Sequence, residues 1–186
     1  MATSRLRFVT IALFASTVSL ILGAPSSAAE YAPGVASISE ETNAYRASKG
    51  VSAIQLDPEL QAIAQSWAQK MAEDHESGQP LNSTLRHNPQ LTAQLPTGWR
   101  SAGENVAYSG GIADPHARLL QLWKESPGHN ANLLNPKWTS MGVGVVTDAK
   151  GVTWGVQVFA EYKNRWIATG PIGDAYAASG GASGSW

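Results

Sequence analysis

Two histidines and two glutamates are the side chains of this sequence whose types and surroundings could support chemistry. His87 and His129 lie in segments rich in proline and glycine, where a turn can present a side chain to a cleft. Glu104 follows a glycine, and Glu125 stands four residues before His129. Two imidazoles and two carboxylates suit zinc or another divalent cation, with one position left for water. These four residues are therefore the candidate ligand-binding set, and His87 and His129 are the candidate metal ligands.

A purely structural interpretation of the same residues stays open. The sequence contains no HExxH motif, so metal ligands would have to come from three separate segments. In the structural interpretation, His129 bridges a turn, His87 lies on a surface loop, and the two glutamates accept backbone N–H bonds. The other two histidines, His75 and His116, are expected to be solvated.

The residue types also limit the catalytic mechanisms. The absence of cysteine excludes disulfides, thiolate metal sites and a cysteine nucleophile. No serine lies in a G-x-S-x-G or S-x-x-K motif, so a serine nucleophile has little support. If the protein is an enzyme, its catalytic residues are expected among the same four. One glutamate would then activate water as a general base, or Glu104 and Glu125 would cleave a glycoside as a carboxylate pair.

Three helices are predicted to position these residues. The first, over residues 37–49, opens with the spacing of a capping box and ends at a glycine. The second, over residues 57–71, opens with Asp-Pro and continues with apolar residues at helical intervals. The third, over residues 114–126, opens in the same way and ends before a proline, so Glu125 lies in its last turn.

Two strands are predicted to follow the helices, over residues 141–146 and 152–159. A four-residue connection joins them, so we expect an antiparallel hairpin. Residues 75–100 have no apolar periodicity and contain three prolines. A connection of this length in a compact domain tends to carry function or to contain short elements. The tryptophans and the apolar residues at helical spacing are expected to form the core.

The first residues of the chain predict export. Arg5 and Arg7 precede an apolar run of 15 residues, which is short for the roughly 20 that a membrane span needs. Small residues at Ser27 and Ala29 suit signal-peptidase cleavage. We therefore expect a signal peptide over residues 1–29, a secreted protein, and no stable membrane insertion after the signal is removed.

The composition predicts a globular domain with a flexible end. Hydrophobic residues make up 43% of the chain and charged residues 15%, which excludes global disorder. The formal net charge is −1, and two of the basic residues lie in the predicted signal peptide, so no basic surface for nucleic acid is expected. Residues 163–186 are predicted to form a flexible tail rich in glycine, serine and alanine.

Several segments occur in an order that is typical of one protein family: Gly103–Ala107, Trp123–Pro136, Met141–Val145 and Trp154–Phe159. Together they resemble the CAP superfamily, also called SCP-like. It includes cysteine-rich secretory proteins, insect venom antigens, plant pathogenesis-related proteins and many bacterial relatives. The resemblance covers residues 37–162 and leaves residues 30–36 as a short N-terminal segment. Because cysteine is absent, the chain is similar to a bacterial, cysteine-free type.

The resemblance implies an α+β fold, a three-layer α-β-α sandwich with a central antiparallel sheet and a large open cleft. Family members line this cleft with two histidines and two glutamates, which correspond here to His87, Glu104, Glu125 and His129. Some members bind zinc or another divalent ion through the histidines. Members that act on ion channels carry a cysteine-rich module, so channel modulation is not implied for this chain.

The resemblance leads to one favoured function and two alternatives. The favoured function is a secreted protein that binds a small-molecule or lipid ligand in the cleft, together with a divalent metal. The first alternative is a secreted hydrolase that uses the same cleft, with glutamate as the general base. The second is a sterol or fatty-acid binding protein. Kinship of fold transfers no reaction by itself, so binding is favoured over catalysis.

Overall fold

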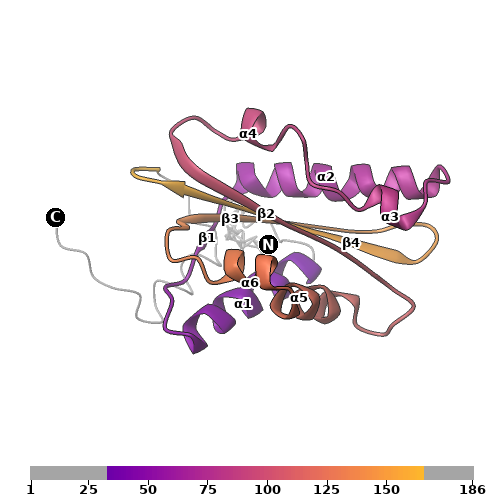
Figure 1. Ribbon diagram of the computed structural model, residues 1–186, viewed down its shortest axis with the longest axis horizontal. Coiled ribbons are helices and arrows are strands. Elements are labelled where there is room, and N and C mark those ends of the chain that lie inside the picture. The colour runs from indigo at the N-terminus through magenta and orange to yellow at the C-terminus, as the bar shows by residue number, and fades with distance from the viewer. Residues whose placement is uncertain (1–32, 166–186) are drawn as a thin grey trace, which may run out of the picture.

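The computed structural model describes residues 33–165, which form six helices and a four-stranded sheet (Figure 1). In chain order the elements are α1 (Pro33–Ser48), β1 (Gln55–Leu56), α2 (Pro58–Glu76), α3 (Leu81–Thr84), α4 (Leu91–Gln94), β2 (Trp99–Gly110), α5 (Pro115–Glu125), α6 (Pro127–Leu133), β3 (Ser140–Thr147) and β4 (Val152–Tyr162). The predicted signal peptide, over residues 1–29, and residues 166–186 of the predicted tail lie outside the described residues. None of the helices within residues 33–165 is long and apolar enough to cross a membrane.

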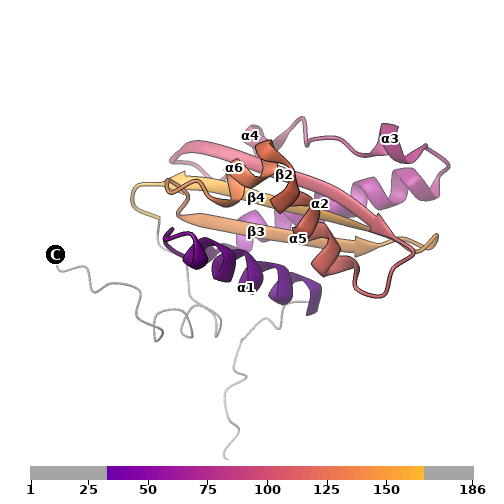
Figure 2. The ribbon, with the colours of Figure 1, turned by 60° about the horizontal axis from the view of Figure 1, so that its bottom comes forward.

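The sheet has the strand order β1-β3-β4-β2. β4 pairs antiparallel with both β3 and β2, whereas the two-residue β1 joins β3 in parallel. One face of the sheet is covered by α2, and the other by α1, α5 and α6, as Figure 2 shows from the second side. This is the predicted α+β fold in three layers, and it leaves β2 as the long strand at one border of the sheet.

The sequence of α2 explains both where it begins and which face it buries. The carboxylate of Asp57 accepts the N–H groups of Glu59 at 2.9 Å and Leu60 at 3.3 Å, and Pro58 occupies the first helical position. Buried residues then recur every three or four positions, at Leu60, Ala64, Ala68 and Met71. They pack in one apolar cluster with the side chains of β4 that point to this face.

Two glycines of β3 allow α2 to lie directly on the sheet. A Cβ atom at Gly142 would overlap the backbone of Leu60, and one at Gly144 would overlap the backbone of Ala64. Glycine weakens an isolated strand, but here it permits a contact between two backbones that any side chain would prevent.

Two glutamine side chains of α2 occupy the outer side of β3. Gln61 accepts the N–H of Val143 at 3.0 Å. Gln65 accepts the N–H of Val145 at 3.0 Å and donates to its carbonyl at 3.2 Å. β1 pairs with the start of β3 on this same side, at Ser140 and Met141, so strand pairing and the two glutamines together occupy much of this side of the strand.

A fully buried arginine ties α1 to the segment that follows α6. Arg46 donates to the carbonyl of Ser52 at 2.8 Å, of Leu133 at 2.7 Å and of Asn135 at 3.0 Å. Burial lowers the pKa of Arg46, since the charged guanidinium is removed from water. The arginine thus supplies donors to carbonyls at the end of α6 that the helix itself cannot satisfy.

The helix starts and the core were predicted better than the strands. α2, α5 and the β3–β4 hairpin lie where the sequence predicts them, and Trp123, Trp138 and Trp154 are buried. The expectation that the tryptophans form the core is wrong for Trp99, which is 36% exposed at the start of β2. α1 begins at Pro33, before the predicted capping box, and Ser37 Oγ donates to Glu41 at 3.1 Å. The region over residues 75–100 contains the short helices α3 and α4. β1, β2 and α6 were not predicted.

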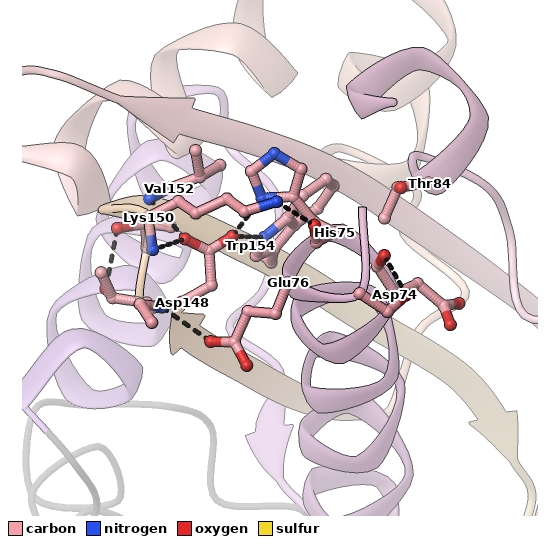
Figure 3. A network of polar contacts seen from close by, with 12 residues as sticks. Asp74, His75, Glu76, Thr84, Asp148, Lys150, Val152 and Trp154 are labelled. Atoms are coloured by element: carbon pink, nitrogen blue, oxygen red, sulfur yellow. Dashed lines mark hydrogen bonds and ion pairs between the residues drawn. The ribbon is translucent and has the colours of Figure 1, made fainter. Parts of the chain in front are cut away.

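The expectation that His75 is solvated is wrong. Its side chain is 12% exposed, and its Nδ1 lies 2.6 Å from Oδ2 of Asp148, whose side chain is fully buried. Figure 3 shows how this carboxylate also accepts the indole N–H of Trp154 at 2.9 Å. Its other oxygen accepts the backbone N–H groups of Lys150 and Val152, both at 2.9 Å. The last turn of α2 is thereby fastened to the turn between β3 and β4.

Candidate functional site

Three consecutive residues of β2 organise the candidate site. At Gly103 a Cβ atom would lie 3.1 Å from Oδ1 of Asn132, so the glycine lets α6 approach the strand. Asn105 is fully buried and donates to the carbonyl of His129 at 3.2 Å. Its carbonyl oxygen accepts from Asn132 at 3.0 Å. These bonds hold the segment that carries His129 against one side of β2.

The side chain of Glu104 lies on the opposite side of β2 from Asn105, because neighbouring residues of a strand face opposite ways. Its Oε1 is 2.7 Å from Nδ1 of His87 and accepts the backbone N–H of Asn88 at 3.0 Å. The carboxylate is 4% exposed, whereas the imidazole is 64% exposed. The pair therefore combines a buried acid with a solvent-facing ring, and Nε2 is the ring nitrogen available to a ligand.

The protonated form of the Glu104 side chain is more favoured in this site than it is for a glutamate in water. Burial raises the pKa of Glu104, and the hydrogen bonds from Asn88 and His87 offset only part of that effect. A carboxylate with a raised pKa accepts a proton more readily at neutral pH than an ordinary glutamate.

His129 lies within electrostatic reach of His87. Burial lowers the pKa of His129, and the charge of a protonated His87 lowers it further. His129 therefore stays neutral at pH values where an ordinary histidine is partly charged. A neutral imidazole can bind a cation or accept a hydrogen bond.

Of these three residues, His129 lines a cavity of about 560 Å³. Its apolar wall includes Leu85, Val106, Ile112 and Leu122, and its polar wall includes Arg118, Ser126 and His129. Leu85 is two residues before His87, and Val106 is two residues after Glu104. His87 and Glu104 themselves do not line the cavity, but each lies two residues along the chain from a residue that does.

The fourth predicted residue, Glu125, has no hydrogen bond or ion pair to the other three among residues 33–165. It is 54% exposed, and it accepts from Gln121 at 2.7 Å and from Arg118 at 3.5 Å, both on its own helix. Ser126, the next residue, lines the cavity instead.

A chain of buried amide and hydroxyl groups crosses the sheet behind the site. Asn132 donates to Asn105, Asn105 donates to Gln157 at 3.1 Å, and Gln157 donates to Thr42 at 2.8 Å. It connects α6, β2, β4 and α1. These residues were not predicted from the sequence, although an asparagine is unfavourable in a strand unless its side chain is bonded, and Asn105 was therefore an available signal.

A complete metal site made of protein side chains is not present in the described part of the chain. Within residues 33–165, no three His, Asp or Glu side chains are grouped so that they could hold a metal ion. The available donors are the imidazoles of His87 and His129. A cation held by them would need its remaining ligands from water or from a bound molecule.

Comparison with known proteins agrees with this architecture. The family model described as the cysteine-rich secretory protein family, CAP, matches residues 40–159. The chain belongs to this family. It is the predicted family, and the chain is a cysteine-free member of it.

The CAP-family relatives include proteins from several bacteria. Protein YkwD of Bacillus subtilis (strain 168) is 33% identical over 130 residues, which cover 66% of this chain and 45% of that protein. The chain therefore spans less than half of the length of that relative. An outer surface protein from Borrelia burgdorferi has a similar structure, with a TM-score of 0.54 and 18% identity, over 70% of this chain and 93% of that chain.

An extracellular protein containing an SCP domain from Bacillus anthracis is also similar in structure, with a TM-score of 0.52 and 23% identity. The match covers 69% of this chain and 40% of that chain. At these identities the likeness establishes the shared CAP fold.

Proposed function

We propose that this CAP protein is exported and binds a small-molecule or lipid ligand in the cavity beside β2, with His87, Glu104 and His129 at its polar side. The observation that carries the proposal is the cavity itself, because ligand sites are mostly apolar hollows with a few polar groups. The extracellular and outer-surface descriptions of the two structural relatives support export.

The two walls of the cavity suit a ligand with one apolar end and one polar end. Leu85, Ile112 and Leu122 would contact hydrocarbon, and Arg118 and His129 would contact a polar or anionic group. A fatty acid has this composition and is a suitable probe.

A divalent cation would be held by His87 and His129. Glu104 would orient the His87 ring through Nδ1, as carboxylates commonly do for ligating histidines. Such a cation would polarise a carbonyl or carboxylate of the bound ligand.

Hydrolysis is the second candidate function, and the raised pKa of Glu104 favours it. In this candidate the buried carboxylate accepts a proton from a water molecule. Glu104→Gln should then abolish turnover of a peptide or ester substrate, while Glu125→Gln should retain it. Turnover that survives Glu104→Gln would contradict this candidate.

Zinc tests the metal part of the proposal. Excess zinc chloride should raise the thermal midpoint of the wild-type protein and of Glu125→Gln, but not that of the His87→Ala/His129→Ala double variant. Equal responses in all three proteins would contradict zinc binding by the two histidines.

Oleate tests the cavity. Isothermal titration should detect binding to the wild-type protein, and Ile112→Asp should weaken it about tenfold because it places a charge on the apolar wall. Ile112 is exposed, so its substitution should leave the fold intact. Equal affinity in both proteins would place oleate elsewhere.

A further inference from the structure

The backbone of β2 presents unpaired hydrogen-bonding groups along one side. The backbone carbonyls of Val152 and Ala160 accept the N–H groups of Asp148 and Thr139, which flank β3. The backbone N–H and C=O groups of even-numbered residues of β4 therefore point toward β3. The backbone groups of its odd-numbered residues therefore point toward β2. Gly155 is in register with Ala107, so the backbone groups of odd-numbered residues of β2 point toward β4. It follows that the N–H and C=O groups of Val106 and Tyr108 point away from the sheet.

The groups on this outer side are free over part of the strand. The carbonyl of Glu104 accepts from Asn132 at 3.2 Å, which agrees with the outward direction of even-numbered residues. Among residues 33–165, no hydrogen-bond partner exists for the outward N–H or C=O of Val106 or Tyr108.

The cavity runs along these free groups. Its lining includes every residue from Val106 to Gly110, and therefore both faces of the strand. Leu85 on one side belongs to the α2 layer, and Leu122 on the other belongs to the α5 layer. A hollow with walls in both outer layers lies at the border of the sheet, where Figure 2 places β2.

We propose that this hollow receives an extended peptide segment of a partner protein, which adds to the sheet as a strand beside β2. This inference rests on the proposed function for the location of the site, and it assigns a second class of ligand, a peptide, to the same hollow. Outward donor and acceptor groups recur every second residue, or about every 6.8 Å, which is the repeat of an extended peptide. No fatty acid or sterol can satisfy such a repeated pattern.

The polar wall favours an acidic peptide. Arg118 lines the cavity, and its contact with Glu125, at 3.5 Å, is long and exposed. A side-chain or terminal carboxylate of the peptide can replace that contact with a shorter one. Apolar side chains at alternate positions would face Leu85 or Leu122.

Amide hydrogen exchange tests the proposal directly. The probe is the peptide acetyl-Thr-Val-Thr-Val-Thr-Glu with a free carboxyl end, added to the mature wild-type protein. Exchange at Val106 and Tyr108 should slow about tenfold once nine-tenths of the sites are filled. Exchange at Ala107 and Ser109 should not change, because their amides already bond to β4.

Matched peptides and two variants supply the controls. One control peptide is N-methylated at its odd positions and the other at its even positions. Only alternate amides of an added strand point toward β2, so one of the two peptides should lose binding and the other should keep it. Val106→Pro removes an outward N–H without removing a bond to β4, and it should lose peptide binding. Val106→Ala also removes packing at this buried position but keeps the N–H, so it should retain peptide binding.

The outcomes separate this inference from the function on which it rests. If the peptide shifts the His87 and His129 resonances but protects neither outward amide, the cleft binds ligands and strand addition is wrong. If neither resonance nor amide responds to millimolar peptide while oleate or zinc binds, strand addition is also wrong. If both amides are protected without peptide and the protein is a dimer, a second copy occupies the edge, which overturns the proposal.

Discussion

Glu104 shows how a single position of a strand can serve both the fold and the site. Its carbonyl accepts from Asn132 of α6, and its carboxylate binds His87 and the backbone of Asn88. The residue therefore joins the α6 segment to the α3 segment across the border of the sheet. The two histidines are brought close by these contacts.

His129 should titrate below the ordinary histidine value of about 6.5. Burial lowers its pKa first, and the charge on His87 lowers it further. NMR titration of the imidazole should show this, and His87→Ala should raise the midpoint because it removes the positive neighbour. Glu125→Gln should leave the midpoint unchanged. If His87→Ala leaves the titration midpoint of His129 unchanged, the two rings are not close to each other.

Arg46 should not tolerate replacement by lysine. A lysine side chain cannot direct donors to the carbonyls of both Ser52 and Leu133 from a rigid fork. Arg46→Lys should lower the free energy of unfolding in urea by about 3 kcal/mol. Arg100→Lys, at an exposed position, should change it by less than about 0.5 kcal/mol. Similar values for the two variants would disprove the role assigned to Arg46.

At the scale of elements, the contact between α2 and β3 depends on the absence of side chains. Gly144→Ala places a Cβ atom inside the backbone of α2 and should lower the free energy of unfolding by about 3 kcal/mol or more. Gly128→Ala is the matched control, because nothing lies near that position and its φ is not positive. It should be neutral or stabilising by about 0.5 kcal/mol. Urea denaturation measures both, and a mild effect of Gly144→Ala would refute the close approach.

The attachment of α2 to the β3–β4 turn should depend on pH. Burial opposes the ionisation of Asp148, but bonds from Trp154, Val152 and His75 outweigh it, so the pKa of Asp148 lies below its ordinary value. Its stabilising effect is therefore complete above the unfolded value of about 3.9 and is lost as pH falls through the folded value.

Asp148→Asn should accordingly lower the free energy of unfolding by about 2 kcal/mol at pH 6, and by less at pH 3. Urea denaturation at the two pH values provides the measurement. Glu73→Gln, at an exposed position of α2, should show no such difference. A deficit of Asp148→Asn that is equal at both pH values would contradict the assigned role.

Local sequence signals predicted the elements that depend on local interactions. The Asp-Pro pairs at residues 57–58 and 114–115 predicted the starts of α2 and α5, where the aspartates accept backbone N–H bonds. β2 escaped prediction because its Gly-Glu-Asn centre lacks apolar alternation and pairs with β4, far along the chain. Its polar residues are stabilised by α6 and by Asn88, which no local pattern reveals.

Of the four candidate residues, His87 and Glu104 are in direct contact. Proximity in sequence suggested that Glu125 and His129 would act together, but the chain enters a new helix between them. Glu125 therefore lies on the exposed side of α5, bonded to Gln121 one turn earlier. His87 and Glu104 are distant in sequence and meet because the segment after α3 lies against β2. The resemblance to the family predicted that meeting, whereas spacing alone left it open.

At the scale of the whole molecule, packing and buried polar groups hold the layers together without disulfides. The chain has no cysteine, so its stability should not respond to the redox state of its surroundings. The hydrogen-bonded series from Asn132 through Asn105 and Gln157 to Thr42 joins α6 and α1 to strands β2 and β4.

Export should yield a chain that begins at Glu30. The basic start, the apolar run and the small residues before Glu30 predict cleavage after Ala29. Expression of the full chain in a bacterium, with mass spectrometry of the culture supernatant, checks the new N-terminus. Lys49→Gln, just after α1, should leave the cleavage site unchanged, whereas Ala29→Arg should abolish cleavage there. Retention of residues 1–29 on the exported protein would contradict the prediction.

The glutamines that bond to β3 also limit how copies of this protein can associate. A sheet with two open sides can polymerise, since each added molecule offers a new surface for the next one. Here Gln61 and Gln65 occupy backbone groups of Val143 and Val145 on one side, so association through the sheet is favoured at the β2 side, where it would end after a single pairing. Within the described domain, this arrangement limits the growth of fibres through the sheet even at high protein concentration.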